Sequence, residues 1–185
     1  MLDTVKTDAQ TRMQKSVDAL RHELTRLRTG RASTALVEPL KVSYYGNDTP
    51  LSQVANVAIA DSRSITITPY EKNMVAAVEK AILASDLGLT PNTVGTVIRI
   101  NLPALTEERR RELSRHVAHE GENAKIAVRN VRRDALHQLK ELLKDKAISE
   151  DEERRAQDEV QKLTDRFVKE VDGVVKAKED ELMAV

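Results

Sequence analysis

Six basic residues recur at helical spacing between Thr106 and Lys146, in the second half of the chain. The same helix has an apolar stripe with steps of three and four residues: Leu113, Val117, Gly121, Ala124, Val128, Val131, Ala135, Leu139 and Leu142. At about 100° per residue the basic residues occupy a sector roughly 100° wide, centred about 110° from that stripe. Arginine predominates, and its planar guanidinium group can bind two phosphate oxygens at once. The pattern therefore indicates a surface for a phosphate-bearing partner, formed by Arg111, Arg115, Lys125, Arg129, Arg132 and Arg133.

A solvated helix face is the alternative interpretation, because surface cations on long helices often pair with acidic residues three or four positions away. Glu122 lies inside the basic sector and could neutralise part of it. By contrast, no acidic residue stands three or four positions from Arg129, Arg132 or Arg133 in either direction. The spacing thus favours phosphate contact. Aromatic residues make up only 2% of the chain, which argues against stacking on single-stranded bases and favours folded RNA.

The sequence contains no recognisable catalytic or metal-binding constellation. His116 and His119 have the spacing of a helical metal pair, but they project away from the apolar stripe and lack a third ligand. No serine or threonine stands in a nucleophile motif, no glycine-rich phosphate loop is present, and the chain has no cysteine. We therefore expect a protein that is not an enzyme and that binds no metal and no cofactor.

Three apolar stripes with steps of three and four residues predict three long helices. The first covers residues 2–29 and stops at Gly30, placed as a C′ glycine. The second covers residues 106–146. The third begins at Ser149, where Glu152 completes a capping box. Because residues 145–148 allow only a short connection, the second and third helices should be antiparallel neighbours. The third stripe is Ala156, Val160, Leu163, Phe167, Val171, Val174, Lys178 and Leu182.

Between Ala32 and Pro103 the apolar period approaches two, which is typical of strands. Strands are expected around residues 42–44, 57–59, 65–67 and 96–100, and one helix over residues 73–85. The predicted fold is α+β: an elongated antiparallel three-helix bundle of residues 1–30 and 105–185, with a small β/α/β domain of residues 31–104 inserted. The two crossings between these domains suggest a hinge, although a rigid corner is also open. The hinge residues are Thr29, Gly30, Arg31, Pro103, Ala104 and Leu105.

Composition limits the setting in which the chain works. The formal net charge is zero over 185 residues, but residues 1–31 and 105–146 lean basic while residues 147–185 are acidic. A neutral molecule can therefore still present a positive face. No apolar run approaches the roughly 20 residues of a membrane span, and the start of the chain does not resemble a signal peptide. We expect a cytoplasmic protein without membrane contact.

Several longer segments make the chain similar to the bacterial ribosome recycling factors. The match extends over essentially the whole length. The segments that carry it are residues 28–33 (RTGRAS), 44–46 (YYG), 49–51 (TPL), 84–89 (ASDLGL), 105–110 (LTEERR), 128–135 (VRNVRRDA) and 148–152 (ISEDE).

The resemblance implies an L-shaped, two-domain monomer that binds the large ribosomal subunit after termination. With elongation factor G it would split the ribosome into subunits, the GTPase alone hydrolysing nucleotide. Arg110 is assigned from the resemblance only, because helical spacing places it near the apolar stripe. The rival interpretation is a helical scaffold that binds protein through the apolar stripes of its helices. The implied ribosomal RNA contacts are Arg110, Arg129, Arg132 and Arg133, with Asn130, Arg28 and Arg31 as weaker members.

Overall fold

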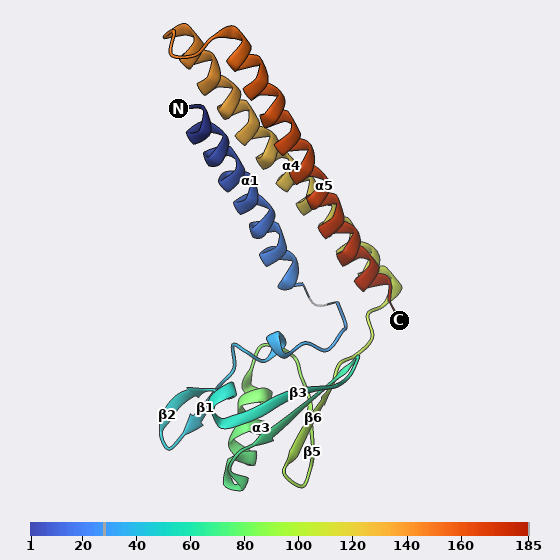
Figure 1. The fold of residues 1–185 in the computed structure, drawn as a ribbon. Helices are drawn as coiled ribbons and strands as arrows, with labels where there is room; N and C mark the ends of the chain where they lie inside the picture. The colour runs from blue at the N-terminus through green and yellow to red at the C-terminus, as the bar shows by residue number, and fades with distance from the viewer. Residues whose placement is uncertain (28, 185) are drawn as a thin grey trace. The chain divides into compact units, whose positions relative to one another are not determined.

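The computed structural model describes residues 1–27 and 29–184 of the chain. The chain divides into two compact units, the first combining residues 1–29 with 106–185 and the second comprising residues 30–105. Long helices form the first unit, and two small antiparallel sheets with one main helix form the second (Figure 1). The predicted α+β class, a helical bundle with an inserted sheet domain, is confirmed.

Three helices run side by side in the described part of the first unit: α1 (Leu2–Thr25), α4 (Glu107–Lys144) and α5 (Glu150–Met183). Helix α4 is antiparallel to the other two (Figure 1). The Thr106 hydroxyl caps α4 by accepting the Arg109 N–H at 3.1 Å. At the start of α5, Ser149 and Glu152 accept each other's backbone N–H at 3.2 Å, so the predicted capping box is confirmed.

The apolar stripes of the three helices form the core of the bundle. Val17, Val128, Val160 and Phe167 are fully buried there. The third stripe differs from the prediction, because Leu163, Val174 and Lys178 are only half-buried whereas Thr164 is buried. The Thr164 hydroxyl donates to the Val160 carbonyl at 2.8 Å, so the helix itself satisfies this buried polar group.

Helix α1 ends at Thr25, and the prediction that it extends to residue 29 is wrong. The last turn tightens, with the Arg26 and Leu27 N–H groups donating to carbonyls three residues back at 3.3 and 3.2 Å. The Thr25 hydroxyl satisfies one further carbonyl, that of His22, at 2.7 Å. Gly30 does have a positive φ of 80°, but it lies four residues beyond the cap at Arg26 and is not a C′ glycine.

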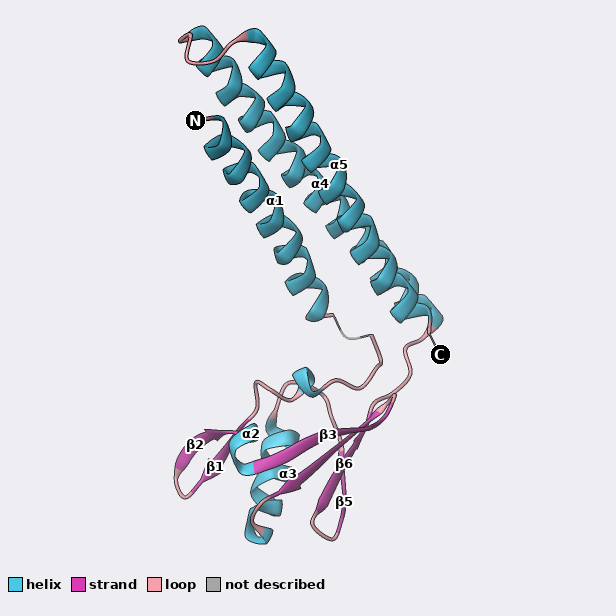
Figure 2. Cartoon of the chain, in the orientation of Figure 1, coloured by secondary structure: helices cyan, strands magenta, loops and turns pink. Residues whose placement is uncertain are grey.

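Two antiparallel sheets make up the second unit, every residue of which is described. Strands β1 (Lys41–Tyr44) and β2 (Asn47–Pro50) form a hairpin. The larger sheet has the order β3-β4-β6-β5 (Figure 2). Helix α3 (Val75–Ala84), preceded by a 3₁₀ turn over Lys72–Met74, matches the helix expected over residues 73–85. The remaining elements are β3 (Ala55–Asp61), β4 (Ser64–Pro69), β5 (Pro91–Val94), β6 (Val97–Asn101), the short helix α2 (Leu51–Val54) and a 3₁₀ turn at Thr34–Leu36.

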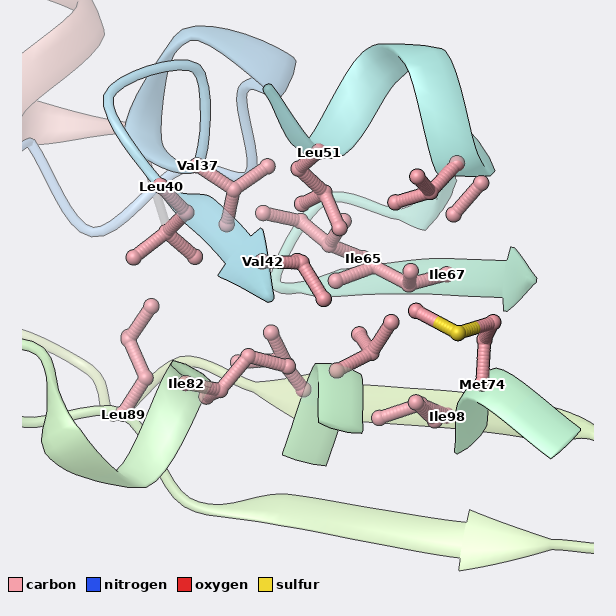
Figure 3. Close-up of a cluster of buried hydrophobic side chains, with 14 residues drawn as sticks. Val37, Leu40, Val42, Leu51, Ile65, Ile67, Met74, Ile82, Leu89 and Ile98 are labelled. Atoms are coloured by element: carbon pink, nitrogen blue, oxygen red, sulfur yellow. The ribbon is translucent and has the colours of Figure 1, made fainter. Parts of the chain in front are cut away.

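The core of this unit lies between the larger sheet, the β1 strand and α3 (Figure 3). Ile65, Ile67 and Ile98 of the sheet meet Val42 of β1 and Ile82 of α3 in one cluster. Each of the three isoleucines is fully buried. The predicted alternation around residues 65–67 is therefore confirmed as one buried sheet face.

Strands β2 and β5 were not expected from the sequence. Both carry turn-forming residues, Asn47 and Asp48 in the first and Pro91 and Asn92 in the second. Neither strand contains a fully buried residue, and each is held by pairing with a neighbour rather than by an apolar face of its own. Among the described residues, no helix combines the length and apolarity that a membrane crossing requires.

Candidate nucleic-acid interface

The outward face of α4 carries three arginines that are free to bind a partner. Arg115, Arg129 and Arg133 are exposed. None of them makes a hydrogen bond or ion pair within the described chain. Asp134 adjoins Arg133 but is engaged elsewhere, because its carboxylate accepts from Arg12 of α1 at 2.9 Å. The positive charge at Arg129 and Arg133 is therefore not neutralised by the bundle.

Arg132 is half-buried and contacts α5. Its Nη1 donates to Gln161 Oε1 of α5 at 3.3 Å. Gln161 in turn donates to Asp165 Oδ1 at 2.9 Å. These two hydrogen bonds orient one edge of the Arg132 guanidinium group. Arg132 forms no ion pair within the described chain, so its positive charge is not neutralised. Arg132 thus lies beside the free cations in a fixed orientation.

Lys125 belongs to the helix–helix contact and not to the free surface. Its Nζ lies 2.5 Å from Asp172 Oδ1 of α5 and 3.5 Å from Glu122 Oε1, and its side chain is only 18% exposed. The hydrogen bond to Asp172 is the main cause that raises the pKa of Lys125 above its ordinary 10.5. The expectation of an open cation at Lys125 is therefore wrong, because its counter-ion comes from a different helix.

Arg111 is also paired, with its Nη2 2.6 Å from Glu107 Oε1 one turn earlier. Both side chains are largely exposed, so this pair contributes little to stability. An exposed pair can open when a phosphate competes for the guanidinium group. Of the six basic residues, Arg115, Arg129 and Arg133 are free, Arg132 is oriented, and two are paired.

The remaining candidate contacts have different surroundings. Arg110 is half-buried on the core side of α4, as its spacing indicated, and its Nε is buried without a hydrogen-bond partner in the described chain. Asn130 is exposed beside Arg129. Arg31 is exposed and belongs to the second unit. Arg28 lies outside the described residues.

Ion pairs with other helices engage three of the four lysine and arginine residues of α1, the exception in the described chain being Lys15. Lys6 lies 2.6 Å from Glu159 of α5, and Arg21 lies 3.0 Å from Glu170 of the same helix. The hydrogen bond to Glu159 raises the pKa of Lys6. Together with the Arg12–Asp134 pair, these contacts tie α1 to its neighbours. Sequence reasoning on α4 alone could not identify the partners of these residues, because they lie on other helices.

The stretches that connect the units are attached to the second unit at one turn. The Ala32 N–H donates to Ser62 O and the Leu102 N–H to Arg63 O, both at 2.7 Å. Gly30 lies against Leu105, since a Cβ built on Gly30 would be 3.3 Å from Leu105 Cγ. Pro103 and Ala104 between these contacts are exposed. The two crossing stretches are therefore neighbours within this unit.

On the bundle side, the flanking residues are held by bundle helices. The Thr29 hydroxyl donates to Glu181 Oε1 of α5 at 3.1 Å, and Thr106 caps α4.

All four histidines are exposed, as expected for His116 and His119. In the described part of the chain, no group of three or more histidine, aspartate or glutamate side chains could hold a metal ion.

Comparison with known proteins agrees with this architecture. The profile of the family described as ribosome recycling factor matches residues 20–183. A ribosome-recycling factor of Xanthomonas oryzae pv. oryzae is 63% identical over 185 residues, with both chains covered completely. A solution structure of a ribosome recycling factor is 44% identical with a TM-score of 0.76, covering 100% of this chain and 98% of that one.

A second solved structure contains a relative together with a partner protein. It describes the Thermus thermophilus (T. thermophilus) factor and Escherichia coli (E. coli) elongation factor G bound to the E. coli post-termination complex. That chain is 44% identical, with a TM-score of 0.64 and complete coverage of both chains. The chain therefore belongs to the ribosome recycling factor family, whose members are translation factors and not enzymes.

Proposed function

We propose that this chain binds the large ribosomal subunit through α4 and, together with elongation factor G, splits the post-termination ribosome into subunits. Family membership supports the activity, and a relative has been placed with that GTPase on the post-termination complex. The chain itself would hydrolyse no nucleotide. Because its target is the ribosome, it would act in the cytoplasm.

The RNA-binding part rests on one observation: Arg129 and Arg133 are exposed and have no internal partner, on a helix that packs against α1 and α5. Guanidinium groups without an internal partner lose no ion pair when they bind phosphate. Arg132 is oriented beside them, and Arg110 and Asn130 extend the proposed contact set. Ribosomal RNA is dense in phosphate, which makes it the matching partner.

The proposed hinge comprises residues 29–31 and 103–105. The Thr29 side chain is hydrogen-bonded to Glu181 of the bundle, whereas Gly30 packs against Leu105 of the second unit. The peptide bond between Thr29 and Gly30 therefore separates a residue held by the bundle from a residue held by the second unit. On the other crossing, Pro103 and Ala104 precede the capped start of α4. Force applied by elongation factor G to the second unit would reach the bundle through these two adjoining stretches, and the bundle would act as a lever on the subunit contacts.

The test is cosedimentation with large subunits over a series of salt concentrations. Four to six phosphate contacts give a slope of log affinity against log salt of roughly −3 to −5. Arg129→Ala and Arg133→Ala should each weaken binding and make the slope shallower by about one. Both variants should also slow subunit splitting in the presence of elongation factor G and GTP.

Arg155→Ala is the matched control. Arg155 is an exposed arginine of α5, about 120° around that helix from Gln161, which contacts α4. Its removal should leave affinity, slope and splitting unchanged. Binding that is independent of salt and unaffected by removing Arg129 and Arg133 would instead indicate the helical scaffold that recognises protein.

A further inference from the structure

One large aliphatic side chain is exposed on the outer surface of the bundle, midway along α4. Ile126 of α4 is 52% exposed and does not belong to the apolar stripe that this helix buries in the bundle core. In the described part of the first unit, the other large hydrophobic side chains with comparable exposure are Met1 and Met183, at helix ends. End positions are tolerant of such exposure, whereas Ile126 is eighteen residues from the nearer end of its helix.

The neighbours of Ile126 on the helix surface are the free polar groups of the proposed interface. Arg129 and Asn130 lie one turn further along, and Arg133 lies two turns further on the same side. All three are exposed. On the other side, Glu122 is one turn earlier and faces Lys125 at 3.5 Å. Ile126 thus borders the uncompensated positive charge.

This combination of groups matches the chemistry of an RNA strand. Phosphates alternate along the strand with ribose rings and bases, which offer apolar faces and edges between the charges. If Arg129 and Arg133 bind phosphates, Ile126, which precedes both on the same side of the helix, would meet such an apolar face next to those phosphates. A protein partner that used Ile126 would need acidic groups to meet Arg129 and Arg133, and a polyanion supplies those at every residue.

We propose that Ile126 makes an apolar contact with a ribose or base of ribosomal RNA, next to the phosphates that Arg129 and Arg133 bind. This inference rests on the proposed function. It assigns to α4 a contact that is not electrostatic, so that part of the affinity persists when salt screens the arginines. The two kinds of contact can therefore be separated by salt.

The experiment compares Ile126→Ala with Arg133→Ala in cosedimentation with large subunits at several salt concentrations. An apolar contact releases no counter-ions, so Ile126→Ala should lower affinity by the same factor at every salt concentration and leave the slope unchanged. With about half of the side chain available for burial, the loss should be about five- to tenfold. Arg133→Ala should instead make the slope shallower by about one.

Two controls separate this contact from a structural effect. Met183→Ala removes an exposed aliphatic side chain of the same unit and should leave binding unchanged. Circular dichroism should show equal helix content for all variants, and Ile126→Gln, which keeps a long side chain but removes its apolarity, should reproduce the loss of affinity. A diazirine-bearing aliphatic amino acid introduced at position 126 should crosslink to ribosomal RNA when irradiated on the large subunit.

Normal affinity of Ile126→Ala, alongside a weakened Arg133→Ala, would overturn the inference and leave the proposed function intact. A changed salt slope for Ile126→Ala, or crosslinks confined to a ribosomal protein, would also overturn it. If neither variant weakened binding, the proposed RNA interface itself would fail.

Discussion

Two glycines inside the long helices should respond in opposite directions to the same substitution. Gly121 of α4 is buried against α5, where an added Cβ would lie 2.5 Å from Val175 Cγ2. Ordinary contact begins at 3.4 Å, so Val175 or the helix must move by about 0.9 Å. Val175 is β-branched and cannot easily rotate away. Gly173 of α5 is exposed, and an added Cβ there would meet no atom within 4 Å.

The magnitudes follow from these surroundings. Overpacking a close contact costs about 1–3 kcal/mol, and replacing glycine by alanine within a helix returns about 0.5–1 kcal/mol. Gly121→Ala should therefore destabilise the bundle, by up to about 2.5 kcal/mol. Gly173→Ala should stabilise it by about 0.5–1 kcal/mol, because only the helix-propensity gain applies.

The assay is guanidinium unfolding followed by far-ultraviolet circular dichroism, since most helical residues belong to α1, α4 and α5. The double variant Gly121→Ala/Val175→Ala should be more stable than the sum of the two single changes predicts, because Val175→Ala removes the Cγ2 atom that the new Cβ would overlap. Equal changes of the same sign at Gly121 and Gly173 would refute the reasoning that close approach of α4 and α5 requires a glycine.

Two further predictions concern packing and pH. Val128→Ala in the fully buried stripe of α4 should lower the free energy of unfolding by about 1–3 kcal/mol in the same assay, and a loss below the error of the measurement would contradict its place in the core. In the second unit, the Tyr44 and Tyr45 hydroxyls donate to Glu71 at 3.1 and 3.2 Å, and the Glu71 hydrogen bond raises the pKa of Tyr44 above its ordinary 10.0. Glu71→Gln should bring that pKa down toward 10.0 in a titration of phenolate absorbance. The stabilisation from this contact is present below pH 10.0 and is lost as the pH rises through the raised pKa, so an unchanged titration would count against the contact.

Local sequence was sufficient wherever one helix or one turn decides the outcome. The capping box of Ser149 and Glu152 involves residues three apart, and the structure contains both of its hydrogen bonds. The spacing of Arg129 and Arg133 likewise predicted their exposure, because the angle around a helix depends only on residue number. The alternation of Ile65 and Ile67 predicted a buried sheet face for the same reason.

The partners of the cations could not be predicted in this way. Lys125 has the spacing of a free basic residue, yet Asp172 of α5 holds it, and Gln161 of the same helix orients Arg132. Strand β2 also lacks a local signal, because its pairing with β1 holds it in place. These contacts join residues that are far apart in sequence, and no periodicity within one segment reports them.

The chain's own residue order thus determined where helices begin, which faces they bury and where arginine recurs, because these properties depend on neighbours within a few positions. Only the packing of α4 against α1 and α5 decided which cations remain available to a polyanion. Asp134 is occupied by Arg12, and Lys125 is neutralised by Asp172. Charge is cancelled by whatever lies nearest in space, and folding brings distant segments to that position.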